Sequence, residues 1–257
     1  MPATSASGAG LKAATRETVF AMWAAELGLS LPELLLPNRG VWISPNRELD
    51  EIIVVRLGAD IRIAAPAFRI AELSEVIGAL PPSNYCDPGF WQEHFPGLIA
   101  SMSVPSMIYY LDTLPGECKG RFEIPKGVRI RGLAASDMKI CAEFAAKLTR
   151  EEREATGLDA IARHAWGVFR DGALASVVSY EAWPGRIAHL GIATAPEFRR
   201  LGLAELALST AIRGIFQRRR IAQFRCDSAD IAGNSLARAL GFLPVVETFS
   251  IRPPAAH

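Results

Sequence analysis

The sequence predicts a mixed α/β chain made of two domains. Stretches rich in β-branched residues, typical of strands, alternate with stretches whose apolar residues recur at helical spacing. A stretch dense in proline and glycine, Asp112–Gly127, separates the two halves, and a length of 257 residues suffices for two modest domains. We expect a smaller α/β N-terminal domain over residues 1–126. Over residues 127–257 we expect an α/β (α+β) domain with a mixed central sheet flanked by helices.

Composition and charge narrow the class of protein. The formal net charge is +1, so a general positive field for nucleic acid is not expected. The first ten residues lack the charged start and apolar run of a secretory leader, and no apolar stretch approaches the roughly 20 residues that span a bilayer. We therefore expect a cytoplasmic protein, monomeric or homodimeric, that binds neither nucleic acid nor membrane. The four scattered cysteines favour buried thiols and no metal site.

The first half contains one clear hairpin between helices. Residues 1–10 are small and polar, and we expect them to be disordered. The predicted elements are a helix from Ala14 to about Gly28, turns over 31–40, a strand at Glu51–Leu57, its hairpin mate at Ile61–Ala64, a helix at Ala71–Leu80 stopped by two prolines, and a strand at Met107–Leu111. The aromatic segment Ser83–Gly97 fits packing between the domains better than a lining for a substrate pocket.

The second half alternates strands and helices throughout. Val128–Leu133 alternates apolar and charged residues like a half-exposed strand. Ser136 and Asp137 are suited to cap the helix that follows, and a polar helix is predicted from Thr149 to about Ala162. Three strands come next, at Ala165–Arg170, Leu174–Trp183 and Ile187–Thr194, joined by turns at Asp171–Gly172 and Pro184–Gly185.

The stretch from Ile187 to Arg218 organises this half. It predicts a strand that stops at Pro196, a tight loop, and a helix that begins directly after it. The first N–H groups of a helix lack an intrahelical acceptor, and the helix dipole places positive charge there. Glycine and alanine in the loop let the backbone approach a ligand closely. The stretch is therefore expected to bind an anion such as phosphate.

Arg199-x-x-Gly202-x-Ala204 resembles the Arg/Gln-x-x-Gly-x-Gly/Ala signature of the GNAT superfamily, the acetyl-coenzyme-A-dependent N-acetyltransferases. Gln223–Ser228, followed by Asn234–Phe242, stands where that family has its next strand, helix and Gly-Phe pair. The resemblance covers roughly Val128–Arg252. It implies the GNAT fold, in which a strand, two helices, three strands, a helix, a strand, a helix and a strand follow one another.

The resemblance implies acetyl-CoA as co-substrate and places it residue by residue. The diphosphate would bind the loop and the helix start, formed by Arg199, Arg200, Leu201, Gly202, Leu203 and Ala204, where arginine offers permanently charged donors. Pantetheine would run along the strand edge at Ile192, Ala193 and Thr194. The asparagine position of the family falls on Asp230, with Asn234 one turn later, and either residue is a candidate.

Acetyl transfer to an amine needs a base, and three residues are candidates. His189 holds the position where related sequences often carry glutamate, and the ordinary pKa of histidine suits the task. Glu181 is the second candidate and Asp227 the third. A lone histidine on a strand is also commonly structural. The resemblance implies direct attack in a ternary complex, with a strand N–H polarising the carbonyl.

The tyrosine that many relatives use as thiolate acid has no counterpart among Leu236, Ala237, Arg238 and Ala239. The leading hypothesis is an N-acetyltransferase that acts on a small amine, with residues 1–126 forming part of the acceptor pocket. A non-catalytic acyl-CoA sensor or scaffold is the alternative, and an interaction module that keeps only the fold is a third. Coenzyme A binding and turnover discriminate among the three.

Overall fold

The computed structural model describes residues 8, 10–36, 41–46, 49–77, 85–113, 124–156 and 164–254. Contacts divide the chain into two compact units that interleave in sequence. Unit 1 comprises Met1–Tyr109, Cys226–Asn234 and Leu243–His257, and unit 2 comprises Tyr110–Arg225 and Ser235–Phe242. Most of the predicted linker lies outside the described residues, so the boundary at residue 126 stays a prediction.

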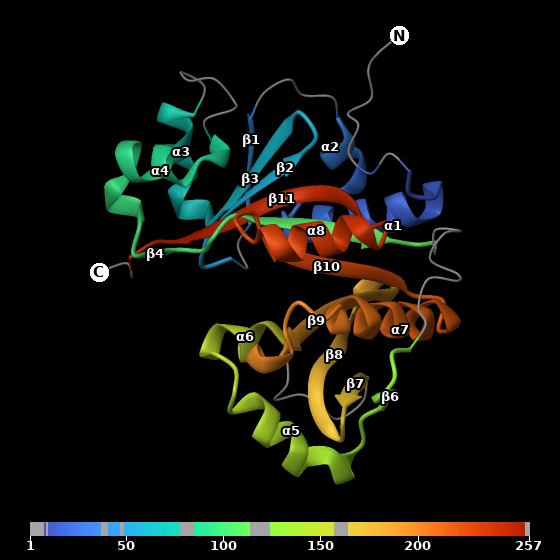
Figure 1. Cartoon of the computed structure of the whole chain (residues 1–257). Helices are drawn as coiled ribbons and strands as arrows, with labels where there is room; N and C mark the ends of the chain where they lie inside the picture. The colour runs from blue at the N-terminus through green and yellow to red at the C-terminus, as the bar shows by residue number, and fades with distance from the viewer. Residues whose placement is uncertain are drawn as a thin grey trace. The chain divides into compact units, whose positions relative to one another are not determined.

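Unit 1 contains the elements of the N-terminal half together with the last strand of the chain (Figure 1). Its strands follow the order β1-β3-β2-β11-β5, with β4 paired to β11. The elements are α1 (Ala13–Glu26), α2 (Leu31–Leu35), β1 (Val41–Pro45), β2 (Ile52–Leu57), β3 (Asp60–Ala65), α3 (Ile70–Val76), α4 (Pro88–His94), β4 (Ser101–Met102), β5 (Ser106–Leu111) and β11 (Leu243–Arg252).

The predicted hairpin β2–β3 is present and antiparallel, whereas α2, β1 and the two-residue strand β4 were not predicted. Helix α2 lies where turns were expected, and a capping box between Ser30 and Glu33 fixes its start. Strand β1 pairs in parallel with β3. The predicted end of the third helix, residues 78–80, and the two prolines after it lie outside the described residues.

The aromatic segment belongs to the core of unit 1. Tyr85, Phe90, Trp91 and Phe95 are buried with aliphatic residues of β2, β3 and β11. The Trp91 indole N–H donates to the carbonyl of Tyr85 over 2.9 Å, and the rings of Tyr85 and Phe90 pack edge to face with centroids 4.8 Å apart. Burial in the core of unit 1 therefore accounts for these aromatics, in place of the packing between domains that was expected.

Unit 2 has the predicted order of elements, which confirms a mixed α/β fold (Figure 1). Strands β6 to β9 form an antiparallel meander, and β10 lies parallel to β9. The elements are β6 (Val128–Gly132), α5 (Met138–Ala145), α6 (Arg150–Thr156), β7 (Ala165–Arg170), β8 (Ala173–Trp183), β9 (Ile187–Thr194), α7 (Leu203–Gln217) and β10 (Ile221–Asp227). Helix α8 (Ile231–Ala239), like β5 and β10, passes from one unit into the other.

Helices cover both faces of the meander. On one face, Phe144 and Leu148 pack against Val177 and Ala193. On the other, α7 packs on β7, β8 and β9, so closely at Gly214 that an added Cβ would lie 2.8 Å from the Trp166 ring. Successive side chains of a strand point to opposite faces. His189 and Glu181 therefore lie on the same face of the sheet as Val177 and Ala193. They lie nearer the end of β8 and the start of β9 than that pair does.

Candidate functional site

The loop between β9 and α7 has the geometry of an anion-binding turn. After a short 3₁₀ turn at Pro196–Phe198, Arg200 and Gly202 adopt left-handed backbone conformations with φ of 64° and 73°. An added Cβ on Gly202 would meet nothing within 4 Å. Glycine is favoured here by its backbone angle, and the space beside it is open to a ligand.

Six consecutive amides, from Arg200 to Glu205, have no hydrogen-bond acceptor among the described residues. Gly202 is the N-cap of α7, and no side chain caps the helix. The 15-residue helix adds the positive end of its dipole at this point. A run of free N–H groups with this dipole attracts a phosphate or diphosphate.

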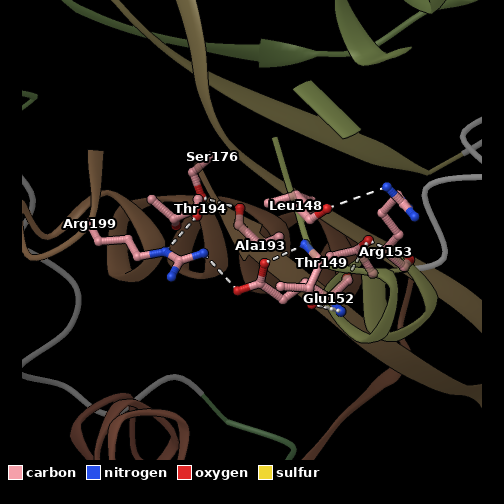
Figure 2. Close-up of polar contacts among 9 residues, drawn as sticks. Leu148, Thr149, Glu152, Arg153, Ser176, Ala193, Thr194 and Arg199 are labelled. Atoms are coloured by element: carbon pink, nitrogen blue, oxygen red, sulfur yellow. Dashed lines mark hydrogen bonds and ion pairs between the residues drawn. The ribbon is translucent and has the colours of Figure 1, made fainter. Parts of the chain in front are cut away.

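The side chain of Arg199 connects the loop to the end of β9 and to α6 (Figure 2). Its Nε donates to the carbonyl of Thr194 over 3.2 Å, and its Nη2 donates to Glu152 Oε1 over 2.7 Å. Glu152 is also the third residue of α6, where it forms a capping box with Thr149. The predicted role of Arg199 as a phosphate ligand stays a prediction. In this structure its guanidinium joins the loop to α6.

Arg200 differs from its neighbour. It is exposed, and among the described residues it has no ion pair or side-chain hydrogen bond. Its side chain is therefore available to a phosphate without breaking an existing bond.

The edge of β9 is open beside the loop. β9 pairs with β8 along its whole length, but its pairing with β10 runs only from Ile187–Ile221 to Leu190–Phe224. The Ala195 amide donates to the carbonyl of Ala175 in β8. Because backbone groups alternate sides along a strand, Ala193 also faces β8, whereas Ile192 and Thr194 face away from it. The Ala193 carbonyl also accepts from Ser176 Oγ. The predicted pantetheine contacts of Ile192, Ala193 and Thr194 stay predictions.

His189 lies next to the point where β9 and β10 stop pairing. Its Nδ1 is 2.7 Å from Gln223 Oε1, and Gln223 Nε2 donates to the Tyr110 hydroxyl over 2.7 Å. The amide of Gln223 thus presents its oxygen to the ring, so Nδ1 carries the proton and donates. In the neutral ring Nε2 keeps its lone pair, and it has no hydrogen-bond partner among the described residues.

The surroundings of His189 keep the ring neutral. Burial lowers the pKa of His189 below its ordinary value of 6.5, and the hydrogen bond with Gln223 opposes this shift. The indole of Trp183 stacks on the imidazole, with ring centroids 4.5 Å apart and planes within 10°. A neutral, oriented imidazole is the form that accepts a proton.

Glu181 is the direct cross-strand partner of His189. Its carboxylate is exposed and accepts from the Trp183 indole N–H over 3.0 Å. The structure therefore brings together two of the three predicted catalytic candidates. The third, Asp227, belongs to unit 1, where it accepts from Ser106 Oγ over 3.3 Å.

Asp230 and Asn234 both serve the start of α8. Asp230 accepts from the amide of Gly233. The buried Asn234 side chain donates to the carbonyls of Asp227 and Asp230 over 2.8 and 2.6 Å, and its oxygen accepts from the Tyr109 hydroxyl. Both of its amide hydrogens are used. The predicted cofactor contacts of these two residues stay predictions.

The described cysteines are free thiols, of which Cys141 and Cys226 are buried, as expected, and Cys86 is only partly buried. Burial raises the pKa of the Cys226 thiol to about 12, so a thiolate nucleophile is not available there. Cys118 lies outside the described residues. Within the described part of the chain, no three His, Cys, Asp or Glu residues gather as a metal site requires, and no helix there is long and apolar enough to cross a bilayer.

Sequence reasoning missed Gln223 and Trp183. A signal for Trp183 existed, because the turn at Pro184–Gly185 sets the register that pairs Trp183 with Ile187 and Glu181 with His189. The contact between His189 and Gln223 has no comparable signal. It joins parallel strands across the intervening helix, and only tertiary packing sets that register.

Comparison with solved structures gives several similar chains. They include a chain presented as a GNAT-family acetyltransferase from Novosphingobium aromaticivorans (20% identity, TM-score 0.46, covering 63% of this chain and 69% of that one). A GNAT-family acetyltransferase from Colwellia psychrerythraea is 13% identical with a TM-score of 0.45, and the match covers 64% of this chain and 61% of that one. A GCN5-related N-acetyltransferase from Kribbella flavida is 19% identical with a TM-score of 0.45, and the match covers 66% of this chain and 65% of that one. The matches thus span less than two thirds of the second and third chains.

Comparison with curated proteins gives no significant match. A family model described as Acetyltransferase (GNAT) family matches residues 133–242, which include β7 to β10, the loop at Arg199–Gly202 and most of the site. The free amides, the open strand edge and the histidine at its end all lie within this segment. Residues 133–242 of this chain belong to the GNAT acetyltransferase family.

Proposed function

We propose that the protein transfers the acetyl group of acetyl-CoA to a small amine by direct attack in a ternary complex. The observation that carries the proposal is the row of unpaired amides from Arg200 to Glu205, placed at the end of a strand whose edge is open. These amides would hold the diphosphate. The backbone groups of Ile192 and the amide of Thr194 would pair with pantetheine, as the family match of this segment leads us to expect, while the Thr194 carbonyl accepts from Arg199.

His189 would act as the general base. Its Nε2 has a free lone pair, its Nδ1 proton is held by Gln223, and the ring is neutral near pH 7 because burial lowers its pKa. Nε2 takes a proton from the ammonium of the acceptor, and the amine nitrogen then bonds to the acetyl carbon while the C–S bond breaks. The second proton of the nitrogen passes through water to the thiolate, which leaves as the free thiol, since α8 offers no tyrosine.

The donor for the developing oxyanion would come from β9 itself. The Ile192 amide faces away from β8 and lies beyond the last residue that pairs with β10. A fixed backbone N–H in a dry site stabilises such a charge without reorganising. The base and the donor would then lie three residues apart on one strand.

The binding step is tested with two matched glycines. Gly202 and Gly172 both have positive φ, and an added Cβ meets nothing within 4 Å at either position. We expect Gly202→Ala and Gly172→Ala to lose similar stability, about 1 kcal/mol. Only Gly202→Ala should weaken coenzyme A binding in calorimetric titration. Equal binding by both variants, or no binding by the unmodified protein, would overturn the assignment of the loop.

The chemical step is tested by following free thiol with acetyl-CoA and a panel of amines. We expect His189→Gln to lower kcat by roughly 10² to 10⁴-fold with coenzyme A affinity unchanged. His164→Gln is the control, because this ring stacks on Tyr180 on the opposite face of the sheet. Binding of coenzyme A without turnover of any amine would instead favour a non-catalytic binder.

A further inference from the structure

An acid, a histidine and an arginine share one face of the sheet in unit 2: Glu181, His189 and Arg225. Glu181 on β8 and His189 on β9 are cross-strand partners, and Gln223 on β10 is the next partner in line. Arg225 lies two residues beyond Gln223 and thus on the same face. With adjacent strands about 4.8 Å apart, the carboxylate and the guanidinium start from strands roughly 10 Å apart with the imidazole between them.

Both charges act on the imidazole. The positive charge of Arg225 lowers the pKa of His189, and the negative charge of Glu181 raises it, although burial is the largest cause of the shift. Opposite effects on one ring place a cation and an anion beside it. This agrees with the positions that the strand register gives.

The guanidinium of Arg225 is available to a ligand. The residue is exposed, and among the described residues it makes no ion pair and no side-chain hydrogen bond. It also stands just past the last pair of β9 and β10, where the strand edge opens. An arginine fork binds a carboxylate through two parallel hydrogen bonds.

Glu181 supplies the complementary charge. Its Oε2 accepts from the Trp183 indole, whereas its Oε1 has no partner among the described residues. An ammonium group held near this oxygen would lie beside the Nε2 atom that removes its proton. A polycation would meet repulsion from Arg225, so the face suits a molecule that carries one charge of each sign.

We infer that the acceptor is an amino acid, or a similar small molecule whose primary amine and carboxylate are only a few bonds apart. Arg225 binds the carboxylate, and Glu181 steers the ammonium toward His189. This inference rests on the proposed function, and it names the acceptor class of that site. Arg225 is a specificity-determining residue that contacts substrate away from the reacting atoms.

The experiment compares each acceptor with the matching molecule in which a neutral carboxamide replaces the carboxylate. Acetyl transfer is followed as free thiol, with α-amino acids and β-alanine on one side and their carboxamides on the other. We expect kcat/KM to be roughly 10- to 100-fold higher for the carboxylates, the value of one charged hydrogen-bonded contact. In Arg225→Gln this preference should disappear because kcat/KM for the carboxylates falls to that for the carboxamides, with the coenzyme A affinity unchanged.

Two further variants set the controls. Arg225→Lys keeps the charge without the fork and should retain part of the preference, whereas Arg213→Gln removes an exposed arginine of α7 and should change nothing. The inference is overturned if the unmodified protein prefers amines without a carboxylate. It is also overturned if Arg225→Gln weakens both acceptors alike or weakens coenzyme A binding, which would assign Arg225 to the cofactor.

A binding measurement separates this inference from the proposed function. Calorimetric titration with a panel of amino acids, with coenzyme A present, needs no turnover. Binding by the unmodified protein that Arg225→Gln loses would support the inference even where no thiol is released. Turnover of simple amines with no measurable binding of any amino carboxylate would retain the acetyltransferase and refute the acceptor class.

Discussion

Two neighbouring tyrosines of β5 begin two hydrogen-bond networks that end differently. Tyr109 donates to Asn234, whose amide donates in turn to the carbonyls of Asp227 and Asp230. Tyr110 accepts from Gln223, whose oxygen holds the Nδ1 proton of His189. Both tyrosines and both amide side chains are buried, so the two networks use the same groups in similar surroundings.

The difference lies at the far end of each network. The Asn234 network closes on the carbonyls of Asp227 and Asp230, which also accept from backbone amides, and both hydrogens of its side-chain amide are used. The Gln223 network stops at an imidazole whose second nitrogen has no partner in the described part of the chain. A closed polar network stabilises the fold, whereas an open one leaves a group ready to react. The predictions below test that distinction.

The largest effect is expected from Gln223→Met. Without the Gln223 amide, the imidazole of His189 can adopt either tautomer. We therefore expect kcat to fall roughly 10- to 100-fold, the size of effect seen when a partner that orients a functional histidine is removed. The hydrogen bond raises the pKa of His189, so its loss should also move the acid limb of the pH profile of kcat/KM to lower pH. A fall in kcat without that movement would indicate a packing defect only.

Asn234→Leu should act on stability. It removes the side-chain acceptor of the buried Tyr109 hydroxyl and the side-chain donor to the carbonyls of Asp227 and Asp230, which keep their backbone donors, and we expect a loss of about 2 kcal/mol in the free energy of unfolding, measured with urea. Turnover by the folded variant at saturating acetyl-CoA should stay near that of the unmodified protein. A large rise in the dissociation constant of coenzyme A would instead show that Asn234 contacts the cofactor, as the family resemblance implies.

The tyrosines offer a matched pair. Tyr109→Phe and Tyr110→Phe each remove one buried hydroxyl and should each cost about 1 kcal/mol of stability. Only Tyr110→Phe should also lower kcat, because it releases the amide that orients His189. Equal effects of the two variants on kcat would contradict the division into a closed and an open network.

The smallest expected effects are shifts of the pH profile. Arg225 lowers the pKa of His189 and Glu181 raises it. Arg225→Gln should therefore move the acid limb of kcat/KM to higher pH, and Glu181→Gln should move it to lower pH. Tyr110, Trp183 and Gln223 are the other polar groups near the ring, and none of them changes in either variant. Shifts in the same direction would show that His189 is not the titrating group.

The second half of the fold could be predicted from the sequence because its elements are long and strongly periodic. β8 and β9 lie within one residue of their predicted bounds. The first half could be predicted less well. The capping box of α2 was readable at Ser30 and Glu33, but β1 is a five-residue strand ending in proline. Val41, Trp42 and Ile43 favour a strand, but so short a run gives a weak signal, and pairing with β3 completes the strand.

The site was predictable as a set of positions and less so as a set of contacts. The glycine and the free amides follow from the motif, because backbone geometry is local. The engagement of Arg199 with Glu152, 47 residues earlier in the chain, depends on where α6 packs. Gln223 became recognisable only once β10 was placed beside β9.

The last strand limits how this protein can be dissected. β11 follows the family segment directly, yet it belongs to unit 1 and pairs with β2 from Glu247 to Ile251. A fragment cut at residue 126 would carry β11 without β2, so a mostly buried strand would present an unpaired edge to other molecules. The acetyltransferase segment is therefore expected to aggregate when it is produced without the residues that precede it.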